Sequence, residues 1–150
     1  MNSFGKFLVA SALAVSLAAC ASGKSTETAG IDSSGKVCIN VRTINGFNPL
    51  SDRELLVTAS VRDYYLFTVF GSCPGLRYAN TIAVADPTSR ICSDGFGKVA
   101  FRDAGRGRQV CQVDQIERVA SPDEAREIAK AREEARREKL RQDKSDSDDG

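Results

Sequence analysis

The chain of 150 residues contains no histidine. Serine and cysteine nucleophiles are usually activated by a neighbouring imidazole, so both of those catalytic arrangements are excluded. No Cys-x-x-Cys pair occurs, which removes the usual motif of thiol–disulfide exchange. The 21 basic and 20 acidic residues nearly balance, so the chain has no bulk electrostatic attraction for nucleic acid. The sequence therefore predicts no catalytic residue, cofactor or metal site, and no nucleic-acid partner.

Long apolar runs are also scarce, and the one that exists lies at the start. It extends from Phe7 to Ala19 and ends in Leu17-Ala18-Ala19-Cys20, the form of a bacterial lipobox. A membrane-spanning helix needs about 20 apolar residues, so this run fits a secretory leader better than a permanent anchor. We expect residues 1–19 to be a signal peptide and Cys20 to carry acyl chains that anchor the protein to a membrane. The alternative is an ordinary signal peptide cut nearby, with Cys20 incidental.

The residue after the cysteine bears on location. Lipoproteins retained in the inner membrane of many Gram-negative cells carry Asp there, whereas this chain has Ala21. By that resemblance we expect a lipid-anchored protein on the periplasmic face of the outer membrane. Residues 20–36 would comprise the lipidated cysteine and a flexible tether, because the segment is small and polar apart from Ile31.

Four cysteines remain if Cys20 is acylated: Cys38, Cys73, Cys92 and Cys111. An even number in an exported domain predicts disulfide bonds. The alternatives are free thiols or a metal site, although zinc sites made of cysteine alone usually contain closely spaced pairs. Four cysteines allow three pairings. Their places in the expected strands and loops favour Cys38–Cys111 together with Cys73–Cys92.

Residues 37–120 alternate apolar and polar side chains with the period of two that is typical of half-buried strands. Turn residues separate the strands, and the Arg62-Asp63 break predicts a hairpin. In the strand that begins near Leu55, Glu54 falls on the polar side and is expected to face water. Strand patterns occur at 37–41, 54–61 and 64–70, near Ile82 and Val84, near Val99 and Phe101, and within 110–119. Together they predict a mainly β fold, a small disulfide-stapled antiparallel sandwich or open barrel.

The last part of the chain changes character at Ser121-Pro122-Asp123-Glu124, a strong helix start with an N-cap serine and a capping-box glutamate. We expect a charged helix over residues 121–142 that docks by its first one or two turns. Large apolar residues are few, so no coiled-coil seam is predicted. Residues 143–150 are expected to be a disordered acidic tail.

Three groups of side chains are candidates for binding or chemistry. Arg102, Arg106 and Arg108 surround a glycine-containing loop and could contact an anion; a solvated hairpin tip is the alternative. The aromatic residues Tyr64, Tyr65, Phe67, Phe70 and Tyr78 could line a groove for a small molecule or glycan, but core packing is the favoured interpretation. The acids of the domain could in principle pair for glycoside hydrolysis. Those acids are Asp52, Glu54, Asp63, Asp86, Asp94, Asp103, Asp114 and Glu117.

The aliphatic and cysteine framework resembles that of small proteobacterial lipoproteins that form a domain-of-unknown-function family. The resemblance is carried by Cys38-Ile39, Leu55 to Val57, Tyr64-Tyr65-Leu66, Cys73-Pro74, Arg90-Ile91-Cys92 and Cys111-Gln112-Val113. It covers residues 37–119, supports the predicted fold and implies no activity. The expected role is non-catalytic binding of an envelope protein, a cell-wall component or a lipid; a small-molecule or glycan-binding module and a carboxylate hydrolase remain alternatives.

Overall fold

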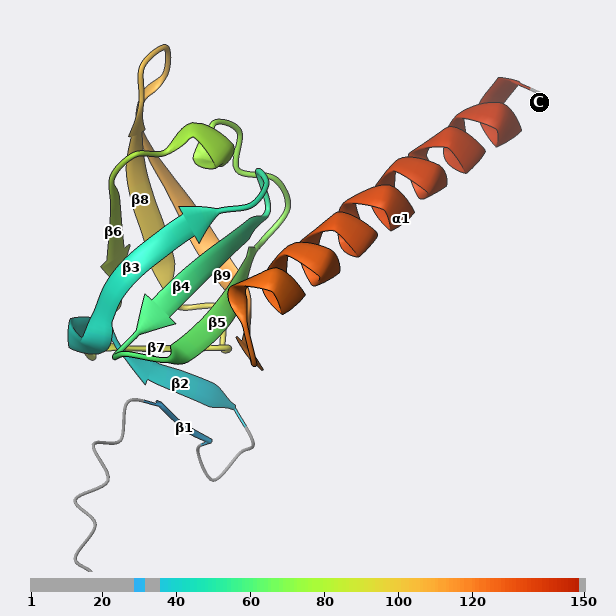
Figure 1. The fold of residues 1–150 in the computed structure, drawn as a ribbon. Coiled ribbons are helices and arrows are strands. Elements are labelled where there is room, and N and C mark those ends of the chain that lie inside the picture. The colour runs from blue at the N-terminus through green and yellow to red at the C-terminus, as the bar shows by residue number, and fades with distance from the viewer. Residues whose placement is uncertain (1–28, 32–35, 149–150) are drawn as a thin grey trace, which may run out of the picture.

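A computed structural model describes residues 29–31 and 36–148 of the chain. The fold is mostly β, with a six-stranded antiparallel sheet curled into a half-barrel, a small second sheet, two disulfide bonds and one C-terminal helix (Figure 1). The predicted fold class is therefore confirmed. The expected signal peptide and Cys20 lie outside the described residues.

The large sheet has the strand order β3-β4-β5-β9-β8-β6. The hairpin predicted at Arg62-Asp63 is present as β4–β5, in which Ala59 pairs with Asp63. β9 is the longest strand; its second half pairs with β5 and its first half with β8, so it carries the curl of the sheet. The strands are β3 (Ile44–Pro49), β4 (Glu54–Ala59), β5 (Asp63–Val69), β6 (Ile82–Ala85), β8 (Lys98–Asp103) and β9 (Gly107–Val119).

β3 was not predicted, because Asn45-Gly46 and Asn48-Pro49 have the composition of turns. The structure instead pairs this segment with β4 as an edge strand, with a register shift between Ile44 and Gly46. Edge strands tolerate proline and bulges, since one side of the backbone needs no ladder partner. Two short 3-10 helices, η1 (Val41–Thr43) and η2 (Leu76–Tyr78), lie in the connections.

The small sheet contains β1 (Ala29–Ile31), β2 (Val37–Asn40) and β7 (Arg90–Cys92), in the order β1-β2-β7. β1 falls within the segment expected to be a flexible tether, so that expectation is wrong for these three residues. β7 occupies only one side of β2, so without β1 the other side would present unpaired backbone groups. An exposed strand edge accepts a further strand readily, even one of weak composition. β1 pairs there, with Gly30 opposite Cys38.

The main core fills the concave side of the large sheet. It is built by inward residues of β4, β5, β8 and β9 and is extended by Ile39 and Ile91 from the small sheet. Its fully buried members on the long strands are Leu55, Val57, Ala59, Tyr65, Phe67, Val69, Val99 and Val113. These are the residues that the period-two pattern places on one face, so this side of the sheet agrees with the sequence.

The helix α1 (Pro122–Asp148) packs on the opposite, convex side of β4, β5 and β9 (Figure 1). Its predicted start is confirmed: the Glu124 amide donates to the Ser121 hydroxyl, and the Glu124 carboxylate accepts from the Ala120 amide. Leu56 and Leu66 on the strands and Ala125 on the helix are buried between the two layers. Both faces of this half of the sheet are therefore buried, although the alternation predicted only one.

The helix ends at Asp148, beyond the expected end at 142. Asp and Ser are weak helix formers, which is why the sequence predicted a disordered tail there. In the structure the hydroxyls of Ser145 and Ser147 donate to the helix carbonyls of Gln142 and Asp143, which ties the last turns to the helix.

The disulfide bonds join Cys38 to Cys92 and Cys73 to Cys111, so the favoured pairing was wrong. Strand topology explains the observed pairs. Cys38 and Cys92 face each other in the β2–β7 register. After β5 the chain stays beside β9, because the Phe70 amide donates to the Gln112 carbonyl, and this brings Cys73 to Cys111.

Candidate functional site

The most structured polar site lies where α1 crosses the convex side of the sheet. Glu54, at the start of β4, is completely buried, contrary to the expectation that it faces water. Its carboxylate is held by Arg136 of α1 through two hydrogen bonds, Nη1 to Oε1 at 2.8 Å and Nη2 to Oε2 at 3.1 Å. The hydroxyl of Ser51 also donates to this carboxylate. A buried carboxylate requires such partners, because an unpaired buried charge is strongly destabilising.

Arg136 contacts a second carboxylate on its own helix. Its Nη2 donates to Glu133 at 2.9 Å, and Glu133 also accepts from Nε of Arg137 at 3.1 Å. Hydrogen bonds from Arg136 and then Arg137 lower the pKa of Glu133 below its usual range. Burial acts to lower the pKa of Arg136, but its bonds to Glu54 and Glu133 outweigh this and raise it. Both groups therefore stay charged near neutral pH.

A second arginine ties the helix to the sheet. Arg132 donates from Nη2 to both carboxylate oxygens of Glu117 on β9, at 2.8 and 2.9 Å. Its Nη1 lies 3.3 Å from the hydroxyl of Thr68 on β5. Together Arg132 and Arg136 connect the helix to three neighbouring strands. Docking thus extends well past the one or two turns expected.

Sequence reasoning missed this site, although a signal for it exists. Ala125, Ala129, Arg132 and Arg136 follow one another at helical spacing, and the two alanines are buried. Residues three and four apart share one helix face. The stripe of small residues that packs on the sheet therefore continues directly into the two arginines.

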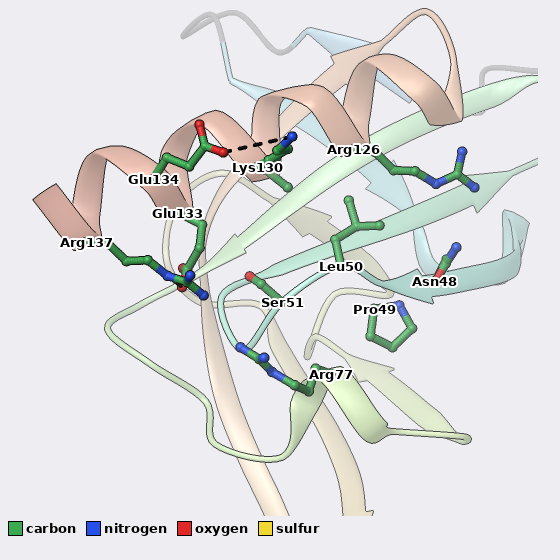
Figure 2. Close-up of a pocket in the computed structure, with 11 residues that line it drawn as sticks. Asn48, Pro49, Leu50, Ser51, Arg77, Arg126, Lys130, Glu133, Glu134 and Arg137 are labelled. Atoms are coloured by element: carbon green, nitrogen blue, oxygen red, sulfur yellow. Dashed lines mark hydrogen bonds and ion pairs between the residues drawn. The ribbon is translucent and has the colours of Figure 1, made fainter.

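A cleft of about 540 Å³ lies between the adjoining face of α1, which carries Arg126, Lys130 and Arg137, and the segment from Asn48 to Ser51 (Figure 2). Its cationic side chains come from both walls, with Arg77 of η2 opposite residues of α1. Each cation has a carboxylate partner: Arg77 with Asp52 at 3.1 Å, Arg126 with Asp123 at 2.5 Å, Lys130 with Glu134 at 4.0 Å and Arg137 with Glu133 at 3.1 Å. An anion entering the cleft would have to displace these pairs.

The three arginines proposed as an anion site lie on the β8–β9 hairpin. Arg102 and Arg108 are direct cross-strand partners, and both line a concavity of about 500 Å³. Arg106 belongs to the turn between the strands and does not line it. Within residues 29–31 and 36–148, none of the three side chains makes an ion pair. The hairpin thus brings together two of the three predicted residues.

The five aromatic residues do not form one face. Tyr65 and Phe67 belong to the main core, and burial raises the pKa of the Tyr65 phenol. Tyr64 packs beside the helix, while Phe70 and Tyr78 are 72% and 78% exposed. The groove that these residues were suggested to line is therefore not formed.

The acids also serve local structure. Asp52 accepts from the amides of Gly75 and Arg77, and Asp63 pairs with Arg118. Carboxylates of Asp86, Asp94 and Asp103 accept backbone amides in their own turns. In the described part of the chain, no group of three or more His, Cys, Asp or Glu side chains is placed to hold a metal ion. Within the same residues, no helix has the length and apolarity that a membrane span requires.

Comparison with known proteins gives a family and no activity. No curated protein and no solved structure matches the chain. A family model matches residues 3–139, and thus extends beyond residues 37–119 to include the N-terminal apolar segment and the docked part of α1. Because the match covers most of the 150 residues, the chain belongs to the family of unknown function DUF6491.

Proposed function

We propose that the protein is anchored in the bacterial cell envelope by acyl chains on Cys20, on the periplasmic face of the outer membrane, and has a non-catalytic binding or structural role. The observation that carries the proposal is the pair of disulfide bonds. Disulfides persist in oxidising compartments outside the cytoplasm. They agree with export directed by the apolar leader that ends at Cys20.

The chemistry of the helix–sheet site supports a non-catalytic role. Glu54 and Glu133 converge, but on the same guanidinium of Arg136. General acid–base catalysis needs a carboxyl group free to exchange a proton with a substrate. These two carboxylates instead fasten the helix to the sheet.

The shape of α1 supports a role in binding or in spanning a distance. The helix has 27 residues, and among the described residues Arg136 is the last to make a hydrogen bond to the sheet. At 1.5 Å per residue the whole helix is about 40 Å long, so its last third projects from the domain (Figure 1). Leu140 on the projecting part is 69% exposed. A rigid arm of this kind suits contact with another envelope component.

Intact mass spectrometry of detergent-extracted protein, before and after reduction with alkylation, tests the anchor. We expect cleavage before Cys20, the added mass of acyl chains, and four alkylated thiols only after reduction. An unlipidated mass would overturn the anchor. Thiols that react without reduction would overturn the oxidised envelope location.

Crosslinking in intact cells tests the binding role. A photo-crosslinking residue at Leu140 should capture a discrete partner, whereas one at Val61, which is 85% exposed in the β4–β5 turn, serves as the control. Capture of no reproducible partner from either α1 or the β domain would contradict a binding role.

A further inference from the structure

The outward side of β6, β8 and β9 is not covered by any element of the described chain. In the register of these strands, Ala83 lies opposite Ala100, and Ala100 opposite Val110. Lys98 and Arg102 follow the same side of β8, alternating with the buried Val99 and Phe101. We call this side, together with Phe96 and Arg106 in the adjoining loops, the basic face.

Four cations on the basic face have no acidic partner among the described residues: Lys98, Arg102, Arg106 and Arg108. The nearest acid in sequence, Asp103, accepts the amides of Gly105 and Arg106 and lies against Gly75 on the inner side. Asp86 and Asp94 lie near the Lys98 end and cap their own turns. Arg102 and Arg108 stand directly opposite each other, an arrangement that is destabilising for like charges. The fold therefore tolerates an uncompensated positive charge here.

Exposed apolar side chains lie among these cations. Val110 is 53% exposed and follows Arg108 on the same side of β9. Phe96 is 71% exposed, and its loop is held in place because Gln112 donates to the Gly95 carbonyl. Cations mixed with an aromatic and an aliphatic side chain are typical of surfaces that rest in a lipid headgroup region.

The basic face also adjoins the N-terminal sheet. Phe96 follows β7 by four positions, β7 pairs with β2, and β2 pairs with β1. The Ser93 amide donates to the Val37 carbonyl, which links the loop before Phe96 to the start of β2. β1, where the described chain begins, lies on the edge of β2 opposite β7, so β2 separates Ala29 from the strand that leads to Phe96.

We propose that the basic face lies on an anionic phospholipid surface, with Phe96 and Val110 at headgroup level and the four cations near lipid phosphates. The inference rests on the proposed lipid anchor only in that the acyl chains bring the domain to a bilayer. Charge complementarity selects the occupant: unpaired guanidinium groups bind phosphate well, and no acid among the described residues occupies them.

A single tryptophan tests the proposal, because the chain has none. The full acylated chain is reconstituted into vesicles of phosphatidylcholine alone or mixed with phosphatidylglycerol. Phe96→Trp or Val110→Trp should show a blue-shifted emission, quenched by brominated acyl chains, only in the vesicles that contain phosphatidylglycerol. Val61→Trp, in the β4–β5 turn outside the basic face, is the control and should emit as in water in both.

The cations are tested in the same reporters. The hairpin triple variant should show no blue shift of tryptophan emission; it combines Arg102→Gln, Arg106→Gln and Arg108→Gln. Without acylation, its partition coefficient onto phosphatidylglycerol vesicles should be lower by about 100-fold. The control removes the same charge elsewhere, through Arg62→Gln, Lys139→Gln and Lys144→Gln, and should retain the shift.

Several outcomes would overturn the proposal. They are equal emission in both kinds of vesicle, a shift that survives the three hairpin substitutions, and a shift reproduced by inorganic phosphate without vesicles, which would indicate a soluble anion instead. The proposal predicts that the reporters bind vesicles without acylation as well, whereas intact mass reports the anchor alone. Failure of the basic face and failure of the anchor are therefore distinguishable.

Discussion

One sheet presents two different outer surfaces. Over β4 and β5 the outward residues include Leu56 and Leu66, which are buried under α1 together with the ion pair of Glu54 and Arg136. Over β6 and β8 the outward residues are alanines and unpaired cations, and nothing in the described chain covers them. Large apolar residues mark the surface that the protein covers itself, whereas small apolar residues with unpaired charge mark the one left open.

The same comparison applies to arginine. Arg136 is ordered by two carboxylates and stabilises the fold, while Arg102 and Arg108 repel each other across a ladder. Removing a cation should therefore destabilise the protein on one surface and stabilise it slightly on the other. The following substitutions test this difference.

The largest effect is expected for Arg136→Ala, which leaves the Glu54 carboxylate buried without its main partner. Breaking a buried pair in this way lowers the free energy of unfolding by about 3–5 kcal/mol. Urea denaturation of the oxidised protein measures it. Arg137→Ala, which breaks only an exposed helical pair, is the control and should change stability by less than about 1 kcal/mol. Equal effects would mean that the buried pair does not hold the helix.

Shortening an apolar side chain under α1 should lower the free energy of unfolding by nearly as much, whereas the same change on the open surface should have little effect. Leu56→Ala removes buried contacts under α1 and should destabilise the protein by about 2–4 kcal/mol. Val110→Ala, on the open surface, should change stability by less than about 0.5 kcal/mol. Thermal unfolding monitored by circular dichroism compares the two. A large loss of stability in Val110→Ala would show that the open surface is covered in solution.

The contribution of Glu133 to the free energy of unfolding should be smaller than these two effects and should depend on pH. The pKa of Glu133 is lowered in the folded state, so its contribution is fully present above the ordinary glutamate value of 4.5 and is lost as pH falls through the folded value. The stability difference between the wild type and Glu133→Gln should therefore be largest near pH 7 and shrink below about pH 4. Unfolding curves across this range measure it. A difference that grows toward low pH would reverse the assigned sign.

The smallest effect should have the opposite sign. Arg102→Thr removes one of two like charges from a directly opposed cross-strand pair and introduces a residue that favours strands. We expect a gain in unfolding free energy of about 0.2–0.5 kcal/mol at low salt, decreasing as salt screens the repulsion. A loss of stability would indicate that Arg102 has a stabilising partner.

The sequence predicted the strands whose alternation arises from one buried face. Leu55, Val57, Phe67 and Val99 lie in the core as expected, because a period of two depends only on local geometry. The helix start at Ser121 followed from a capping motif within four residues. Such features are local and can be read without knowing the fold.

Features that depend on distant partners could not be predicted. Glu54 is buried because Arg136, 82 positions away, reaches it from α1. The disulfide pairing depends on β9 lying between β5 and β8, which places Cys111 beside the loop that carries Cys73. Arg102 and Arg108 were identified from their loop, yet only the register shows that they face each other.

The order of the two crosslinks has a mechanical consequence. A pulling force that enters from the N-terminal side would first peel β1 from β2 and then reach Cys38. There the load passes through sulfur to Cys92, so the intervening stretch, spanning a separation of 54 positions, bears no tension. The bond from Cys73 to Cys111 gives no further shortcut, because along the chain Cys73 is as far from Cys92 as Cys111 is. Under load the first bond therefore protects the chain between β2 and β7 from unravelling, and further extension has to come from the part between Cys92 and α1.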